Sequence, residues 1–307
     1  MSSVCLQTSN ANVTGGCDIC GHLSARELYT AEDRLSNAGW SFFIARCEGC
    51  GVLRTLPEMT EDELASFYPR DYWGAGQEFS ERWLRKSQGE KLKFLDAHSL
   101  DGGRILDTGC GSGLFLRSLD SRRWDRCGVE TGERAWEAAT KSLGADNIFH
   151  GTLLDARFDA ASFDTVSFWS ALEHMNNPRE NLLEAARVLR RGGTLIVQVP
   201  NAGCYQARFF GGDWFALDAP RHRYHFSRQT LDCLLDQAGF EPYGATMFSR
   251  AHNAHALRQS LKKRLEAGRG GISYIGFCLT IPFIKPADFI LTLLGSGATL
   301  TVAARKR

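Results

Sequence analysis

From about residue 103 onward, apolar and polar positions follow two alternating patterns along the chain. Short apolar runs predict strands, and segments with apolar residues three or four positions apart predict helices. The expected strands are 104–108, 126–130, 147–150, 163–169, 194–199, 241–248 and 298–304. The expected helices are 114–119, 135–143, 180–189 and 227–238. Strands that alternate with helices favour an α/β fold built on a mostly parallel sheet.

Several helix ends carry recognisable end signals. Asn177 is placed to cap the helix at 180–189, with Pro178 in its first turn and Gly192-Gly193 beyond its end. Thr60-Glu-Asp-Glu63 has the capping-box form and predicts a helix through Phe67, which Pro69 ends. A long amphipathic helix is expected from about 80 to 98. Residues 59–99 therefore read as a helical linker or lid.

One stretch between a strand and a helix is rich in glycine. Ile105–Leu116 holds glycines at 109, 111 and 113, so its spacing is G-x-G-x-G. Leu114 stands where the dinucleotide fingerprint needs its third glycine, and no Gly-Lys-Ser/Thr follows for a phosphate-binding loop. Asp107 lies where a cationic, amine-bearing ligand would be attracted. The stretch resembles the cofactor loop of class I S-adenosylmethionine-dependent methyltransferases.

Composition sets limits on the class of protein. The chain has 307 residues and a net charge of +1, from 36 basic and 35 acidic side chains. That balance makes nucleic acid an unlikely main partner, because nucleic-acid-binding proteins usually show a basic excess. No signal-peptide pattern is present, and the longest apolar run, 272–284, is shorter than the ~20 residues of a spanning helix. A cytoplasmic protein is expected.

Four of the ten cysteines form two tight pairs. Cys17-Asp-Ile-Cys20 and Cys47-Glu-Gly-Cys50 are separated by 26 residues, and each is followed by glycine. Two such knuckles are typical of a closed four-thiolate zinc site, which has a structural role. Unliganded cysteines and a redox pair are the alternatives. Residues 16–58, here called the four-cysteine module, are thus expected to be a zinc ribbon after a flexible tail at 1–15.

Over about 100–305 the chain resembles a class I methyltransferase, and more closely a bacterial group that commonly carries such a cysteine module. The resemblance lies in Ser170–Met175, in Leu189–Asn201 and in the long loop Trp214–Ser227. It implies a Rossmann-like, seven-stranded, mostly parallel sheet whose last strand is antiparallel, over 100–307 with an insertion at 251–295. Members often act in pathways for surface glycans, lipids or secondary metabolites.

The resemblance also implies which residues bind the cofactor. Glu130, 23 positions after Asp107, would accept hydrogen bonds from the ribose hydroxyls, and Leu154 and Asp155 would face the adenine. An exposed acid and a turn aspartate are the ordinary alternatives, and the aromatic rings at 168 and 169 also suit a core. The expected set is Asp107, Gly109, Cys110, Gly111, Gly113, Glu130, Thr131, Leu154, Asp155, Phe168, Trp169 and Tyr72.

Methyl transfer to a hydroxyl requires the acceptor to be positioned and its proton removed. Histidine suits that task because its pKa lies near ~6.5. His174, after the strand at 163–169, and His222 are competing candidates for the base. His225 would hold its loop, Asp218 would orient a histidine, and Arg221 would hold an anionic substrate group.

A catalytic metal is not favoured. Some related quinone O-methyltransferases bind a divalent metal through acidic residues and the histidine near this strand. Of that arrangement only Glu173-His174 is present, because Ser170 stands three positions before Glu173.

The insertion at 251–295 joins a basic stretch to an apolar run. Its basic residues are Arg258, Lys262, Lys263, Arg264 and Arg269. The apolar run from Ile272 is expected to be broken by Pro282 and Pro286. The pattern predicts either a lid or homodimer contact, or a peripheral contact of 257–295 with the inner face of the membrane.

The leading functional hypothesis is O-methylation of a small-molecule, glycan or lipid-linked acceptor. One alternative is an RNA methyltransferase that recognises RNA through its zinc ribbon, although the neutral charge and the absence of an Asn-Pro-Pro-Tyr-type motif argue against it. Another alternative is a non-catalytic S-adenosylmethionine-binding protein whose module serves as a docking surface.

Overall fold

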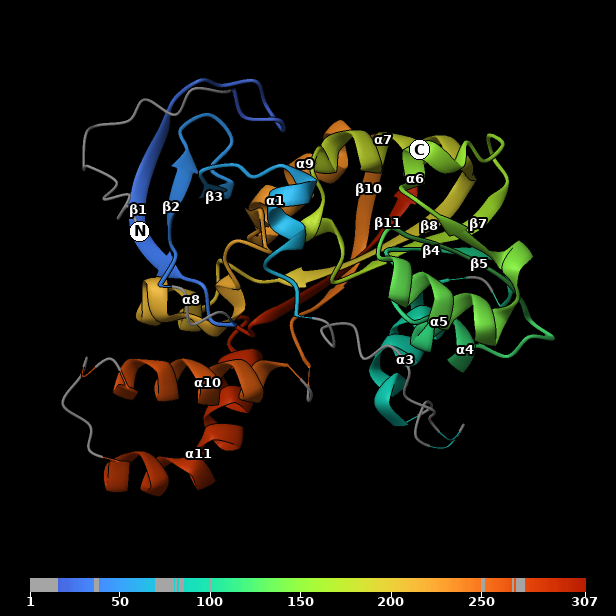
Figure 1. Ribbon diagram of the computed structural model, residues 1–307. Coiled ribbons are helices and arrows are strands. Elements are labelled where there is room, and N and C mark those ends of the chain that lie inside the picture. The colour runs from blue at the N-terminus through green and yellow to red at the C-terminus, as the bar shows by residue number, and fades with distance from the viewer. Residues whose placement is uncertain are drawn as a thin grey trace.

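The computed structural model describes residues 16–35, 39–69, 80, 82, 86–99, 101–249, 252–266, 268 and 274–307 (Figure 1). The expected tail at 1–15, Tyr72 and Arg269 lie outside the described residues.

The larger sheet has the predicted α/β organisation. Its strands are β4 (Gly103–Thr108), β5 (Trp124–Glu130), β6 (Ile148–His150), β7 (Phe163–Trp169), β8 (Leu189–Pro200), β10 (Phe240–Thr246) and β11 (Thr299–Lys306). Across the sheet they run in the order β10-β11-β8-β7-β4-β5-β6. β4 through β8 pair in parallel, and β11 is antiparallel to both β8 and β10. The predicted seven strands and the antiparallel last strand are confirmed.

Helices cover both faces of this sheet because its strands are apolar on both sides. Ile105 packs against α3 (Gly89–His98), α4 (Leu114–Ser118) and α5 (Glu133–Leu143), whereas the next residue, Leu106, packs with α7 (Pro178–Val188) and α9 (Arg228–Gln237) (Figure 1). Successive side chains of a strand point to opposite faces, and parallel sheets are commonly buried on both. The carboxyl ends of β4, β5 and β7 therefore lie at one edge of a rigid core.

The four-cysteine module builds a second sheet together with the α/β domain. β1 (Ala25–Glu32), β2 (Ser41–Cys47) and β3 (Leu53–Leu56) are antiparallel, and the fourth strand is β9 (Tyr224–His225). β9 belongs to the long loop after β8. The module is therefore continuous with the α/β domain through shared backbone hydrogen bonds.

Of the two helix N-caps expected from the sequence, one forms as predicted and the other only in part. Thr60 forms the predicted capping box with Glu63 at the start of α1 (Glu61–Ala65). Asn177 occupies the N-cap position of α7, but its side chain makes no capping hydrogen bond and its amide contacts Glu180 instead. The cap expected from Asn177 is thus present in position only, and Pro178 supplies the helical start.

The insertion forms a helical hairpin that sequence reasoning did not resolve. α10 (Asn253–Glu266) and α11 (Tyr274–Leu293) lie beneath the short helix α8 (Tyr205–Phe210), away from the large sheet (Figure 1). Pro282 and Pro286 lie inside α11, so the expected break at these residues is wrong. Each proline removes one backbone donor, a loss that the rest of the helix tolerates here. In the described part of the chain, no helix is long and apolar enough to cross a membrane.

Candidate active site

The glycine loop between β4 and α4 has one side open to a ligand. Gly109 and Gly111 have φ angles of +70° and +56°, a region that side-chain-bearing residues rarely adopt. A Cβ on Gly109 would lie 2.8 Å from the Cβ of Ala171, whereas a Cβ on Gly111 would meet no atom within 4 Å among the described residues. Gly111 is therefore the position at which a ligand can approach the backbone.

Glu130 ties this loop to the end of β5. Its Oε2 accepts a hydrogen bond from the Gly111 amide, and its Oε1 accepts one from the Gly132 amide, both at 2.8 Å. Burial raises the pKa of Glu130, and these amide donors act in the opposite direction. A carboxylate has about four lone-pair sites, so two amide donors leave acceptor capacity for a diol.

Asp107 and Lys91 place opposite charges near the end of β4. The Asp107 carboxyl is buried and accepts a hydrogen bond from the Ser167 hydroxyl at 2.7 Å. Burial raises the pKa of Asp107 to about 7, and Lys91 acts to lower it. The Lys91 Nζ lies 5.3 Å from the ring centroid of Trp169. The sequence did not indicate Lys91 as a site residue, because the spacing of residues along a helix does not show which end of the sheet a lysine side chain contacts.

The other residues expected to bind the cofactor differ in their burial and in the face of the sheet on which they lie. Trp169 packs on the α3–α5 side, and Phe168 is fully buried on the opposite side of the sheet, so only the backbone of Phe168 faces the edge. Leu154 is 41% exposed, whereas its neighbour Leu153 is buried. Asp155 closes a capping box with Thr152 at the start of α6 (Leu153–Ala156).

Cys110 and Thr131 flank the loop. The Cys110 amide donates to the Val129 carbonyl at 3.1 Å, and its thiol is buried. The Thr131 carbonyl lies 3.2 Å from the Nε2 of His150. The first contact joins the ends of β4 and β5, and the second joins the ends of β5 and β6.

Two histidines from separate segments meet beside β7. His174 lies in the short 3-10 helix Leu172–His174, and His222 lies in the segment 214–227, here called the histidine loop. Their ring centroids are 4.5 Å apart at an interplanar angle of 85°. The Nδ1 of His174 lies 3.0 Å from the Arg221 carbonyl, and the Nδ1 of His222 lies 2.9 Å from the Ala216 carbonyl.

Those carbonyls determine the tautomers, because a carbonyl oxygen accepts hydrogen bonds and cannot donate. Each Nδ1 therefore carries a hydrogen, and each Nε2 carries the lone pair of the neutral ring. Burial lowers the pKa of His174 to about 4, and burial together with His174 lowers the pKa of His222 well below its usual value. Both rings are neutral near pH 7, in the tautomer that a proton acceptor at Nε2 requires.

Glu173 adds a buried carboxyl group to this pair. It is 1% exposed, and among the residues that the structure describes neither of its side-chain oxygens has a hydrogen-bond partner. Burial raises the pKa of Glu173 to about 8. One ligand atom from each of Glu173, His174 and His222 lies within 4.8 Å of the other two. Glu173 therefore belongs to the same cluster as the two histidines.

The structure corrects the roles expected for Arg221 and Asp218. The Arg221 side chain is fully buried and donates to Asp33 at 2.7 Å, to Asp218 at 2.6 Å and to the Phe67 carbonyl at 2.8 Å. It is therefore not available to hold a substrate anion. Asp218 accepts from Arg221 and from Arg34, and its Oδ2 is 3.9 Å from the His222 Nε2, too far for a hydrogen bond. It orients two arginines rather than a histidine.

Burial acts to raise the pKa of Asp218, but His222, Arg221 and Arg34 hold it below its usual range. The buried arginine and its two carboxylates form one charge network that joins β1, α1 and the histidine loop. The Nε2 of His225 lies 2.9 Å from the hydroxyl of Thr55 on β3.

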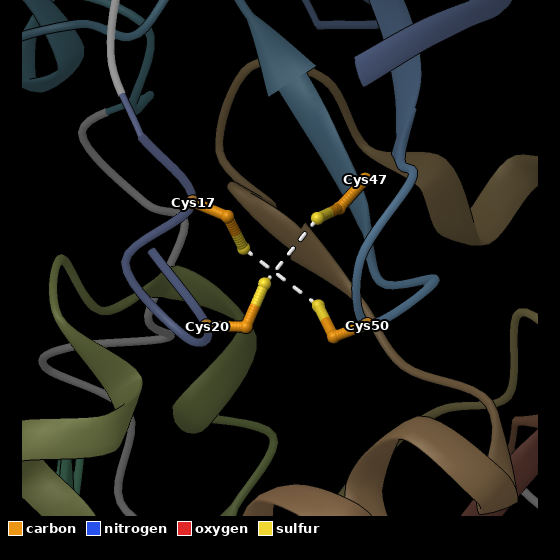
Figure 2. Close-up of side chains that lie close together, drawn as sticks. All are labelled: Cys17, Cys20, Cys47 and Cys50. Carbon is orange, nitrogen blue, oxygen red and sulfur yellow. Dashed lines mark hydrogen bonds between the residues drawn. The ribbon is translucent and has the colours of Figure 1, made fainter. Parts of the chain in front are cut away.

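The four cysteine sulfurs converge on one point (Figure 2). The Cys17 and Cys50 sulfurs are 3.7 Å apart, and the Cys20 and Cys47 sulfurs are 3.6 Å apart. A tetrahedral zinc ion with Zn–S bonds of ~2.3 Å places its sulfurs ~3.8 Å apart, whereas a disulfide needs ~2.05 Å. The donor set and its spacing therefore fit a tetrahedral metal.

Comparisons with known proteins agree with this arrangement. A family model described as a methyltransferase domain matches residues 79–243, more than half of the chain. The chain is similar to the ubiquinone biosynthesis O-methyltransferase of Hahella chejuensis, with 30% identity over 136 residues, which cover 42% of this chain and 56% of the relative. It is also similar to the O-methyltransferase rstn1 of Aspergillus nomiae, with 30% identity over 195 residues, which cover 59% of this chain and 83% of the relative.

A solved structure of an S-adenosylmethionine-dependent methyltransferase from Archaeoglobus fulgidus shares 17% identity at a TM-score of 0.48, covering 74% of this chain and 95% of that one. The alignment with the Hahella relative spans little more than half of that protein. The family match, the two relatives and the strand order β10-β11-β8-β7-β4-β5-β6 lead to one assignment. The chain belongs to the methyltransferase domain family and has the fold of the class I S-adenosylmethionine-dependent enzymes.

Proposed function

We propose that this protein transfers a methyl group from S-adenosylmethionine to a hydroxyl oxygen of a small biosynthetic acceptor, with glycan and lipid-linked molecules included in that class. The observation that carries the proposal is the edge of β4 and β5, where the open backbone at Gly111 meets the carboxylates of Asp107 and Glu130. That edge lies beyond the carboxyl ends of parallel strands, where open α/β sheets bind ligands. The O-methyltransferase names of the relatives support oxygen as the acceptor atom.

The cofactor end of the site suits an amino acid joined to a nucleoside. The Asp107 carboxylate complements a cationic amine or sulfonium, and the Lys91 ammonium complements a carboxylate. Glu130 retains acceptor capacity for two ribose hydroxyls. When bound, S-adenosylmethionine supplies a methyl group on a positively charged sulfur, and the C–S bond breaks as the acceptor's O–C bond forms. Leu154 and Asp155 remain the proposed neighbours of the adenine.

Glu173, His174 and His222, here called the histidine cluster, are proposed to bind the methyl acceptor. The Nε2 of His174 or of His222 takes the hydroxyl proton, because backbone carbonyls hold both Nδ1 atoms in the protonated form. Glu173 lies beside both rings and supplies a second carboxyl group through which the proton can be passed on. We retain both histidines as candidates, since their tautomers are equivalent.

The four-cysteine module is proposed to bind one structural zinc ion. A closed set of four thiolates leaves no open coordination position, so the ion would stabilise the fold and take no part in methyl transfer. Cys17, Cys20, Cys47 and Cys50 would be its ligands. The chemistry of the site is thereby assigned to the sheet edge and the histidine cluster.

The hairpin of α10 and α11 is proposed to contact either an anionic membrane surface, as a cytoplasmic peripheral protein would at the inner face, or a second copy of the chain. α11 and the residue that follows it expose large apolar side chains, namely Phe283, Phe289, Ile290, Leu293 and Leu294. Exposed apolar groups beside basic ones are typical of interfacial segments. We expect the protein to float with vesicles that contain anionic lipid but not with neutral ones. If the protein is recovered only in the soluble fraction and light scattering shows a dimer, the result would support contact of the hairpin with a second copy of the chain.

Methyl transfer is tested with S-adenosylmethionine labelled in its methyl group and a panel of hydroxylated aromatic compounds. We expect labelled product from the wild type, and a loss of about 10²- to 10⁴-fold in the rate at saturating cofactor for whichever of His174→Ala and His222→Ala removes the base. The other variant should lose less. Because burial lowers the pKa of His174 to about 4, protonation of this ring should not reduce the rate between pH 8 and 6, and a fall in that range would instead report Glu173, whose pKa burial raises to about 8.

His255→Ala is the matched control, since His255 lies on α10 and contacts Phe215 outside the cluster. Its rate should equal that of the wild type. Near-wild-type rates for both cluster variants would contradict the assignment of the base. No transfer to any acceptor would favour the non-catalytic alternative.

A further inference from the structure

We propose that the four-cysteine module fixes the conformation of the histidine loop of its own chain. Thr55 of β3 is the positioning residue. This inference rests on the proposed function, since it assumes that the histidine cluster serves methyl transfer. It assigns the module a part in the acceptor side of the reaction, in addition to the stability that a metal site provides.

The module and the histidine loop are joined by strand pairing. Leu53 pairs with His225 and Arg54 with Tyr224 in antiparallel register, and the Thr55 amide donates to the Arg223 carbonyl at 2.9 Å. β9 is only two residues long, and so short a strand is not stable without a partner. The backbone of the histidine loop at 223–225 therefore takes its conformation from the edge of β3.

The hydroxyl group of Thr55 is buried between two residues of the histidine loop. Its Oγ1 lies 2.6 Å from the His222 carbonyl and 2.9 Å from the Nε2 of His225. The carbonyl can only accept, so the single hydroxyl proton goes to His222, and Thr55 accepts from the Nε2–H of His225. One hydroxyl thus holds the backbone at His222 and fixes the tautomer of His225.

The positions that Thr55 holds are close to the proposed base. The His225 and His222 ring centroids are 6.5 Å apart, and those of His222 and His174 are 4.5 Å apart. A shift of ~1 Å in a catalytic group can cost ~10²-fold in rate. Loss of the hydroxyl bond at the His222 carbonyl would therefore change the position of the His222 ring relative to the acceptor.

The cysteine knuckles contact both strands, β3 and β9, that join the module to the histidine loop. The Tyr224 hydroxyl donates to the carboxylate of Asp18, which lies between Cys17 and Cys20. On the other side, the Cys47 amide donates to the Val52 carbonyl at 2.9 Å, directly before β3. The four residues Cys17, Ile19, Cys47 and Val52 also pack in one hydrophobic cluster with Tyr224 and Phe226. The knuckles, β3 and β9 therefore form one packed unit.

The sheet order also bears on the docking alternatives. In the order β1-β2-β3-β9, the histidine loop already occupies the free edge of β3. A partner that added a strand there would have to displace β9. The arrangement favours action on the protein's own loop over recruitment of a separate molecule at this edge.

The test compares Thr55→Val, which keeps the shape but removes the hydroxyl, with Thr55→Ser, which keeps the hydroxyl. Thr30→Val is the matched control, because Thr30 is an exposed threonine on β1 of the same module. For each protein we measure S-adenosylmethionine affinity by calorimetry, kcat for the best acceptor of the panel, and histidine tautomers by ¹⁵N NMR. The tautomer measurement needs no acceptor.

We expect Thr55→Val to lose about 10-fold or more in kcat, within the ~10²-fold that misplacement costs, while the Kd for S-adenosylmethionine stays unchanged. The Nε2–H signal of His225 should be lost in this variant and retained in Thr55→Ser, whose kcat should recover. Thr30→Val should match the wild type in all three measurements.

Two results would overturn the inference while leaving the proposed function standing. The first is a Thr55→Val protein with wild-type kcat and an unchanged His225 signal. The second is a Thr55→Val protein that loses cofactor binding together with activity, since that would show a general structural role. A wild type that binds no S-adenosylmethionine or transfers no methyl group would instead contradict the proposed function, and this inference with it.

Discussion

Replacing Glu130 with alanine is expected to weaken S-adenosylmethionine binding by about 10²- to 10⁴-fold. The variant loses two kinds of contact at once. The proposed hydrogen bonds to the ribose hydroxyls disappear, and bonds to a charged acceptor contribute ~1.5–3 kcal/mol each. The Gly111 and Gly132 amides, which Glu130 now holds at 2.8 Å, also lose their acceptor. Since ~1.4 kcal/mol corresponds to tenfold in Kd, two such bonds account for the predicted range.

The measurement is isothermal titration calorimetry with S-adenosylmethionine. Glu133→Ala is the matched control, because Glu133 begins α5 three residues later and makes no hydrogen bond to the glycine loop. Its affinity should stay within about twofold of the wild type, and the melting temperatures of both variants should show that they fold. A Glu130→Ala protein that keeps wild-type affinity would refute the placement of the cofactor at this edge.

Replacing Cys47 with serine is expected to remove zinc from the protein and to lower its melting temperature by on the order of 10 °C. Structural zinc sites contribute folding free energy directly, of about 10–16 kcal/mol in isolated zinc-finger peptides. Loss of even a few kcal/mol shifts the melting temperature of a chain this size by ~10 °C. Cys47 is almost completely buried, so the serine hydroxyl would also be left in an apolar environment.

Elemental analysis of the purified wild type should find about one zinc per chain, and Cys47→Ser should contain far less. Cys233→Ser is the control, because Cys233 is an exposed cysteine on α9, distant in sequence from both knuckles. It should retain both the zinc and the wild-type melting temperature. A wild type without metal, whose stability Cys47→Ser does not change, would contradict the zinc assignment and favour free thiols.

Together the two predictions separate the site into two parts. The first addresses the cofactor edge, which is built from β4, β5 and the glycine loop. The second addresses the module that carries β3 and, through Thr55, contacts the histidine loop. If both hold, cofactor binding should survive loss of the metal while methyl transfer should not, since the module contributes only to the acceptor side.

Features encoded by nearby residues were predictable from the sequence. The turn at Gly109 and Gly111 and the capping box at Thr60 each depend on a few adjacent positions, and the structure shows them as expected. The two cysteine knuckles belong to the same class, because each brings two thiols together within four residues. The strand and helix pattern from β4 to β8 likewise follows from local periodicity.

Features that depend on distant contacts were not predictable in this way. Arginine is a residue type that can bind a substrate anion, so the sequence suggested this role for Arg221. Only its contacts with Asp33 and Phe67, which are distant in the sequence, show that Arg221 is buried. Lys91 became a candidate only because α3 packs beside Trp169. Pro282 and Pro286 were expected to break the apolar run, but a helix continues through them.

The amino-acid sequence by itself determined the fold class and the methyl donor implied by the family resemblance, and it supplied the residues proposed to bind the cofactor, because strand ends and tight turns are set by neighbouring side chains. The tertiary structure decided how the acceptor side is assembled. β9 pairs with β3 across more than 160 residues, and a single hydroxyl at Thr55 joins the module to His222 and His225. Such contacts depend on how the folded elements dock, and their burial and hydrogen bonds exist only in the packed chain.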